Sequence, residues 1–226
     1  MTDLLDAAIE LPPRTGAAQQ LFVLLHGVGN EPGSLMPLAG ALREIFPSSA
    51  IVAPRGFSPF DSGPGGRQWF SVRGIDEENR PARVAAIMPR VIAMVRAAQE
   101  KWKVPPIATA LGGFSQGAIV SLEAIQAEDG LGGRVMAFGG RYATLPDVAP
   151  RWTTIHLLHG DADRVMPVRH AQMAMHHLAS LNGDVTIDIA HGVGHELHPA
   201  LIERAVDRLQ SRIPIRYWQR AFGGST

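Results

Sequence analysis

The sequence predicts an α/β fold with a mainly parallel central sheet and helices on both faces. Short apolar runs alternate along the chain with longer amphipathic segments, which is the pattern of βαβ units. The first run, residues 21–25, is continuously apolar, as strands covered on both faces are. A chain of 226 residues with 46% hydrophobic and 19% charged residues also holds enough apolar material for one such core.

Each expected element in the first half of the chain has a local reason. Residues 21–25 form a strand that His26-Gly27 closes, residues 34–46 a helix, and residues 50–53 a short strand that Pro54 stops. The helix expected at 80–101 has an apolar stripe at 3.6-residue spacing, although Pro89 predicts a kink or a break within it. That stripe consists of Val84, Ile87, Met88, Val91, Ile92, Val95 and Ala98.

The second half continues the alternation. Residues 107–111 are the next expected strand, and residues 116–127 form a helix with Ile119, Leu122 and Ile125 facing inward. Further strands are expected at 134–138, 154–158 and 185–190, and helices at 168–181 and 199–212. We expect a single domain over residues 1–226, with an N-terminal lead-in at 1–19 and a C-terminal tail at 213–226. No helical block separates the motifs, so no large cap domain is expected.

The composition excludes several classes of partner and site. Lys+Arg and Asp+Glu both number 21, so no overall positive charge points to nucleic acid. The absence of cysteine removes disulfides, thiolate nucleophiles and Cys-ligated zinc. No apolar stretch approaches the ~18 residues of a membrane span, and the acidic N-terminus is unlike a signal peptide, so a cytoplasmic protein is expected.

The aromatic pair Tyr217-Trp218 predicts that the tail covers its own core or forms a homodimer contact.

The strongest motif is Gly113-Phe114-Ser115-Gln116-Gly117, a G-x-S-x-G between an expected strand and an expected helix. A chain that turns this sharply places Ser115 at the tip with strained dihedrals, and the two glycines let strand and helix approach closely. The free N–H groups at the helix start favour an oxyanion there. A chance match is the alternative in a chain with 24 glycines, but the strand–turn–helix context favours a nucleophile.

A serine nucleophile needs a base and a group that orients the base. His195 lies in a glycine-flanked loop after the strand at 185–190, and we expect it to be the base. Two aspartates compete for the third role in the segment after the strand at 154–158. Asp161 directly follows Gly160 and has the alternative role of capping its own turn. We expect Asp163 to accept a hydrogen bond from the Nδ1–H of His195.

The remaining site residues are expected from the needs of acyl transfer. The backbone N–H of Gln116 and that of Val28, in the loop after the first strand, are the candidate oxyanion donors. His26 in that loop is expected to brace it by hydrogen bonds. The long loop at 55–74 carries Trp69 and Phe70, which we expect to form a pocket wall with Met166. The histidines near His195 lack a helical ligand spacing, so neither a metal nor another cofactor is expected.

Four segments together resemble the phospholipase/carboxylesterase family of α/β-hydrolases, in its bacterial carboxylesterase branch, which is related to acyl-protein thioesterases. The segments are Leu25-His26-Gly27-x-Gly29, Gly113-Phe114-Ser115-Gln116-Gly117, His159-Gly160-Asp161-x-Asp163-x-x-x-Pro167 and Gly194-His195-Glu196. The resemblance implies the α/β-hydrolase fold, a triad of Ser115, Asp163 and His195, and oxyanion donors at Val28 and Gln116. It also implies that Trp69-Phe70 borders the acyl pocket.

These observations predict a serine carboxylesterase that cleaves esters of small to medium acyl chains through an acyl-enzyme. A small-molecule ester is the expected partner. An acyl thioesterase or a lysophospholipase would use the same triad with a longer acyl groove. A non-catalytic binding protein with the same fold ranks below both, because it has no need of a complete triad.

Overall fold

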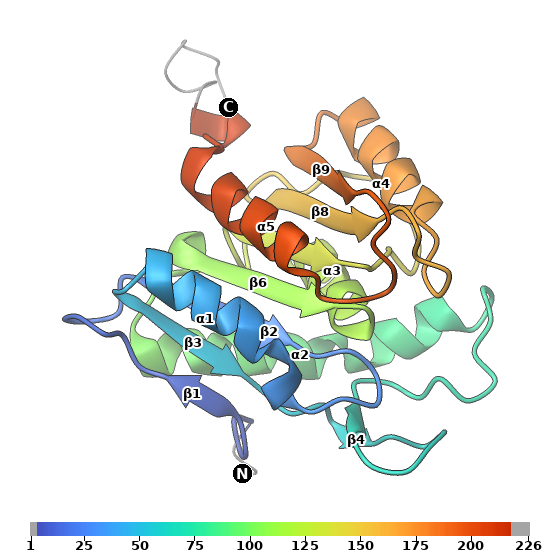
Figure 1. Ribbon diagram of the computed structural model, residues 1–226, viewed down its shortest axis with the longest axis horizontal. Coiled ribbons are helices and arrows are strands. Elements are labelled where there is room, and N and C mark those ends of the chain that lie inside the picture. The colour runs from blue at the N-terminus through green and yellow to red at the C-terminus, as the bar shows by residue number, and fades with distance from the viewer. Residues whose placement is uncertain (1–3, 218–226) are drawn as a thin grey trace.

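A mostly parallel sheet of seven strands runs through the protein (Figure 1). The computed structural model describes residues 4–217. In spatial order the strands are β1 (Ile9–Leu11), β3 (Ser49–Ala53), β2 (Gln20–Leu25), β6 (Thr109–Phe114), β7 (Arg134–Phe138), β8 (Thr154–Gly160) and β9 (Val185–Ala190). Among the described residues of this sheet, β1 alone pairs antiparallel, with β3, and the other neighbouring strands are parallel.

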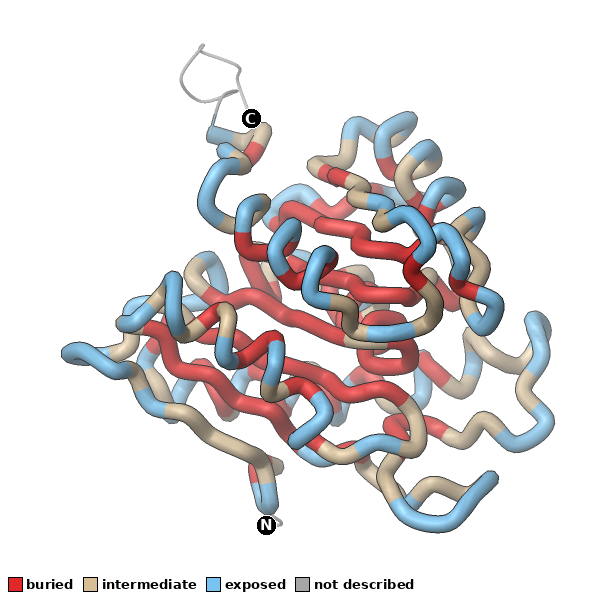
Figure 2. The backbone as a smooth tube through the Cα atoms, in the orientation of Figure 1, coloured by how far each residue is buried: buried red, intermediate tan, exposed pale blue. Residues whose placement is uncertain are grey.

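Helices cover both faces of the sheet, so the strands are the most buried part of the molecule (Figure 2). On one face the core joins the sheet to α2 (Arg80–Trp102), α3 (Gln116–Ala127) and α4 (Arg169–Ser180), and on the other to α1 (Met36–Ile45) and α5 (Pro199–Ser211). Strand β2 serves both cores, because Leu21, Val23 and Leu25 belong to the first and Phe22 and Leu24 to the second. This double coverage explains its continuous apolar run.

The structure confirms the predicted fold class, and its main addition is β1. This strand lies inside the expected lead-in at residues 1–19 and pairs Ile9 with Ala53 and Leu11 with Ile51. It was missed because three residues give too short a pattern for period-two alternation, and its partner strand lies far along the chain.

Several boundaries also differ from the expected ones. The segment expected as the start of a strand at 107–111 is a 3₁₀ turn, Pro106–Ala108, and β6 extends instead to Phe114. Another 3₁₀ turn, Pro32–Leu35, precedes α1. The loop at 55–74 contains a small antiparallel pair, β4 (Ser58–Pro59) with β5 (Arg67–Gln68). None of these changes moves a candidate site residue to a different part of the fold.

Pro89 does not divide α2, which runs unbroken from Arg80 to Trp102. Of the two expected outcomes, a kink or a break, the break does not occur. Pro89 and Ala85, one turn earlier, are both exposed, so the Ala85 carbonyl that loses its helical donor faces water. The buried stripe of the helix lies on its other side.

The segment after α5 packs against the sheet at the start of β7 and β8. Pro214 is buried, and the Arg134 guanidinium donates to the Arg212 carbonyl (2.8 Å). Ile213 and Tyr217 remain exposed, at 53% and 45%. Trp218, the other half of the predicted aromatic pair, lies outside the described residues.

No helix within residues 4–217 has both the length and the apolar character needed to cross a membrane.

His156 on β8 makes the stability of the protein depend on pH. Its ring is fully buried, and burial, assisted by the charge of Arg134, lowers the pKa of His156 to about 3. The unfolded chain binds a proton at this residue below pH ~6.5, whereas the folded protein does not, so stability falls as the pH drops from 6.5 toward 3. We expect this residue to remove about 2 kcal/mol of unfolding free energy between pH 7 and pH 5.

Urea unfolding at both pH values, with His156→Gln beside the parent protein, measures this contribution. The amide keeps a polar group beside Thr186, whose hydroxyl oxygen lies 2.8 Å from His156 Nδ1, and does not titrate. The variant is expected to lose less stability on acidification than the parent does. An equal loss in both proteins would contradict the assignment.

Candidate active site

Ser115 occupies a strained turn between β6 and α3. Its φ of 55° and ψ of −116° put a non-glycine residue in a sparsely populated backbone region, as the G-x-S-x-G motif predicts. A Cβ on Gly113 would lie 2.2 Å from the Gly117 carbonyl oxygen, and one on Gly117 would lie 2.0 Å from the Leu25 carbonyl oxygen. Both glycines are therefore needed for the strand, the turn and the neighbouring loop to fit together.

Three predicted residues meet at the carboxyl ends of the parallel strands. His195 Nε2 lies 2.9 Å from Ser115 Oγ, and His195 Nδ1 lies 2.6 Å from Asp163 Oδ2. Ser115 follows β6, Asp163 follows β8 and His195 follows β9, so the sheet brings together residues far apart in the chain (Figure 1). The arrangement is a continuous Ser–His–Asp chain of hydrogen bonds.

The carboxylate of Asp163 is buried and held from several sides. Its Oδ1 accepts hydrogen bonds from the backbone N–H groups of Val165 (2.9 Å) and Met166 (2.8 Å), which leaves Oδ2 for His195. His159 Nε2 lies 3.4 Å from Oδ2 and donates to the Met166 carbonyl at 2.6 Å. Burial lowers the pKa of His159, so this imidazole is neutral near pH 7.

Asp161 takes a different part in the structure. Its exposed carboxylate accepts from the Gly192 N–H and lies 2.7 Å from His191 Nδ1. The hydrogen bond to His191 lowers the pKa of Asp161. The role considered for it, capping its own turn, is wrong, because its partners lie in the next loop along the sheet edge. Asp161 thus ties the loop after β8 to the loop that carries His195.

The two candidate oxyanion donors belong to residues near Ser115. Gln116 is the first residue of α3, where backbone N–H groups have no helical acceptor. Within the described part of the chain, neither its N–H nor that of Val28 donates a hydrogen bond. A Cβ on Gly27, next to Val28, would lie 3.4 Å from the Ser115 Cβ, so the Val28 loop passes close to the serine.

A buried network fixes the loop that carries Trp69 and Phe70. The Gln116 side chain accepts from the Trp69 N–H and donates to the Phe70 carbonyl, both at 2.8 Å. The Trp69 indole N–H donates to the His26 carbonyl, and His26 Nε2 accepts from the Gly56 N–H, each at 2.9 Å. Burial lowers the pKa of His26. The bracing role expected of His26 is confirmed, whereas that of the Gln116 side chain was missed, because no pattern in the sequence marks it.

The predicted pocket residues differ in exposure. Trp69 is only 1% exposed, so its ring supports the loop from inside and does not itself face solvent. Phe70 is 5% exposed, and Met166 is half-buried directly after the Asp163 turn.

Among residues 4–217, no group of three or more His, Asp or Glu side chains is placed to hold a metal ion.

Known proteins with similar sequences include one family of hydrolases and two named relatives. Residues 7–213 match the sequence profile of the family described as Phospholipase/Carboxylesterase. The chain is 48% identical over 207 residues to esterase YpfH of Escherichia coli (strain K12), covering 92% of this chain and 89% of that protein. It is 26% identical over 185 residues to acyl-protein thioesterase 1 homolog 1 of Dictyostelium discoideum, covering 77% of this chain and 79% of that protein.

Solved structures show the same architecture. The structure of esterase PE8 superimposes with a TM-score of 0.83 at 28% identity, covering 91% of this chain and 98% of that one. A carboxylesterase from Bacillus cereus, at 16% identity, has a TM-score of 0.75, covering 88% of this chain and 91% of that one, and it supports the fold alone. The fold is therefore the α/β-hydrolase fold.

The Gln116 side chain provides a test of the buried network. Gln116→Leu would leave the Trp69 N–H and the Phe70 carbonyl buried without partners, which costs about 1–3 kcal/mol of unfolding free energy. Urea unfolding measures the loss. Gln172→Leu, at an exposed position of α4, is the matched control and should change stability by no more than about 0.5 kcal/mol. Equal stabilities for the two variants would contradict the bracing role.

Proposed function

The chain belongs to the phospholipase/carboxylesterase family and is a carboxylic ester hydrolase, and we propose that Ser115, His195 and Asp163 are its catalytic triad. The observation that carries the proposal is the pair of contacts made by His195, 2.9 Å to the serine hydroxyl and 2.6 Å to the buried carboxylate. These contacts give the imidazole a proton to take and a group that fixes its orientation.

The reaction follows from these contacts. Ser115 Oγ attacks the ester carbonyl carbon while His195 Nε2 takes the hydroxyl proton. The resulting imidazolium is stabilised by Asp163, whose Oδ2 accepts from Nδ1–H. The carbonyl oxygen becomes an oxyanion that accepts hydrogen bonds from the N–H groups of Val28 and Gln116. His195 then protonates the departing alcohol, which leaves the acyl group esterified to Ser115.

The second half of the cycle uses the same groups. Water attacks the acyl carbon as His195 removes its proton, and a second oxyanion forms. The collapse of that intermediate returns the proton to Ser115 and releases the carboxylic acid.

Phe70 and Met166 are the proposed contacts of the acyl chain, with Trp69 supporting Phe70 from within. We propose esters of small to medium acyl chains as substrates.

Further proposals concern the substrate, the location and the partners of the protein. Thioester hydrolysis is the second candidate activity, favoured by the 26% identity to the Dictyostelium thioesterase homologue. A cytoplasmic location, the absence of a nucleic-acid partner and a homodimer contact stay predictions. The exposed apolar side chains of Ile213 and Tyr217 support the homodimer contact.

A series of p-nitrophenyl esters from acetate to palmitate tests the substrate class. Activity should peak at short or medium chains, and Ser115→Ala and His195→Ala should each lower kcat by roughly 10⁴-fold or more. A peak at long chains would favour the thioesterase or lysophospholipase alternative. Activity of the parent protein no higher than that of Ser115→Ala would contradict Ser115 as the nucleophile.

The neighbouring aspartates form a matched pair of variants that tests the acid. Asp163→Asn removes the carboxylate that holds the Nδ1–H tautomer of His195, so kcat should fall by roughly 10⁴-fold. Asp161→Asn changes a carboxylate that bonds only to the exposed loop at His191 and Gly192, and it should keep most of the activity. A severe loss in Asp161→Asn with a mild loss in Asp163→Asn would overturn the assignment.

A further inference from the structure

A hollow of about 220 Å³ lies at the opposite end of the sheet from the triad. Gln20, Thr109 and Arg134 line it where β2, β6 and β7 begin, whereas Ser115 follows the carboxyl end of β6 (Figure 1). Most of its lining is apolar and comes from the sheet and from the carboxyl-terminal ends of α1 and α5. The remaining lining residues are Phe22, Phe46, Ile107, Ala108, Ala110 and Leu209.

Arg134 supplies the charge of this hollow, since every other lining residue is uncharged. Its guanidinium donates to the Arg212 carbonyl at 2.8 Å and to His156 Nε2 at 3.4 Å, and neither acceptor is a carboxylate. An arginine has five N–H donors, and the others make no hydrogen bond to a described residue. A cation with free donors therefore stands beside apolar walls.

No carboxylate among the described residues accepts a hydrogen bond from Arg134, although Asp184 lies near it. The neighbouring carboxylate, Asp184, already accepts from Arg212, from the Thr154 hydroxyl and from the Ile215 N–H. Arg216 lies beside the same threonine, 3.4 Å from its hydroxyl. The Nε atoms of Arg212 and Arg216 are buried and have no hydrogen-bond partner among residues 4–217. Arg134, Arg212 and Arg216 thus lie near one carboxylate, Asp184, which is hydrogen-bonded to Arg212, and an anion would stabilise this group of positive charges.

We propose that this hollow binds a carboxylic acid with a short apolar chain, its carboxylate paired with Arg134 and its chain lying against Phe22, Phe46 and Leu209. Guanidinium groups bind carboxylates through two parallel N–H···O bonds, and the apolar walls favour burial of the chain. A cavity of ~150 Å³ holds benzene, so 220 Å³ admits an acid of about six carbons.

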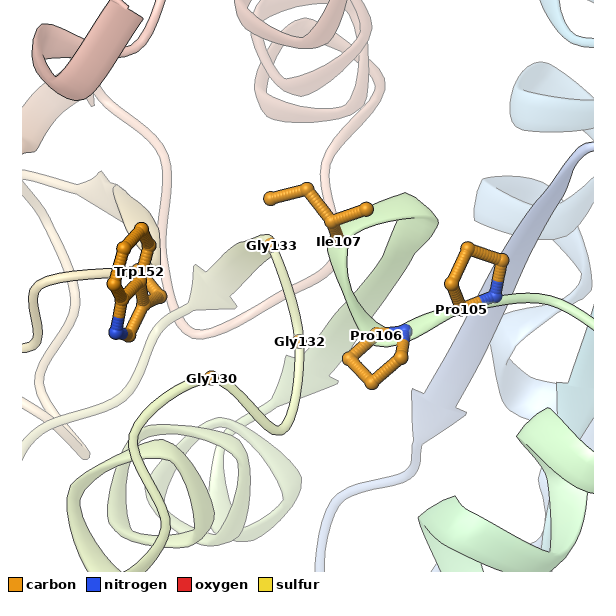
Figure 3. A pocket seen from close by; sticks show the side chains of 7 residues that line it. All are labelled: Pro105, Pro106, Ile107, Gly130, Gly132, Gly133 and Trp152. Carbon is orange, nitrogen blue, oxygen red and sulfur yellow. The ribbon is translucent and has the colours of Figure 1, made fainter. Parts of the chain in front are cut away.

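The ligand belongs to the chemical class that ester hydrolysis releases. The hollow therefore binds the type of product that the enzyme forms, at a site away from the triad. An adjacent hollow without a charged residue is a comparison for the hollow that Arg134 lines (Figure 3). It shares Ile107 with the first and is otherwise lined by Pro105, Pro106, Trp152 and three glycines of the segment 130–133. Its lining holds no charge, so it has nothing to pair with a carboxylate.

Thermal unfolding with added acids tests the proposal on enzyme whose serine is blocked by a fluorophosphonate, with the intact mass confirming the block. Butyrate, hexanoate and octanoate are compared with acetate and inorganic phosphate at constant ionic strength. Hexanoate at ten times its Kd should raise Tm by about 3–6 °C. Affinity should increase about three- to fourfold for each added methylene until the hollow is full.

Variants locate the binding. Arg134→Met keeps the apolar stem and removes the charge, so hexanoate should bind at least tenfold more weakly. Arg204→Met, at an exposed position of α5, is the matched control and should bind hexanoate like the parent. If Arg134→Met does not fold, Leu209→Trp, which fills the hollow from α5, should abolish the dependence on chain length.

Three results would overturn the proposal: no rise of Tm with any acid on the blocked enzyme, equal rises in Arg134→Met and Arg204→Met, or a rise with phosphate as large as that with hexanoate. A failure of the fluorophosphonate to react would count against the triad alone. In that case the comparison of the two arginine variants still tests the hollow.

Discussion

The close approach of three backbone segments at Ser115 is the constraint on which the rest of the site depends. The turn after β6 must pass so near to the end of β2 that a side chain at Gly117 would collide with the Leu25 carbonyl at 2.0 Å. This contact holds the turn at Ser115 against the loop that carries Val28, and the parallel sheet sets the distance to the loops after β8 and β9. The strain at Ser115 persists because these surroundings fix it.

Neighbouring residues make different contacts because of the same geometry. Asp163 points inward to His195, whereas Asp161, two residues earlier, points outward and ties two loops together. In Gln116 the backbone N–H donates to no residue among 4–217, while the side chain holds Trp69 and Phe70. The two ends of the sheet also differ. One end brings His195 between Ser115 and Asp163, and the other holds Asp184, paired with Arg212, near Arg134 and Arg216.

The sequence predicted most of the fold and the whole Ser115–His195–Asp163 contact, because motifs at strand ends are local and a parallel sheet brings those ends together. Strand β1 could not be found from three residues without its partner. The continuity of α2 through Pro89 depends on which side of the helix faces water, a fact of packing. The bracing by the Gln116 side chain and the burial of Trp69 likewise depend on contacts between distant segments, which no local pattern encodes.

Covalent labelling tests whether Ser115 is a nucleophile that His195 activates. The protein is treated with a fluorophosphonate, and peptide mass spectrometry locates the adduct. One adduct per chain is expected, on the peptide that contains Ser115, and the rate of labelling should fall by orders of magnitude in His195→Ala. An adduct on another residue, or equal rates in the parent protein and in His195→Ala, would contradict the activation of Ser115 by His195.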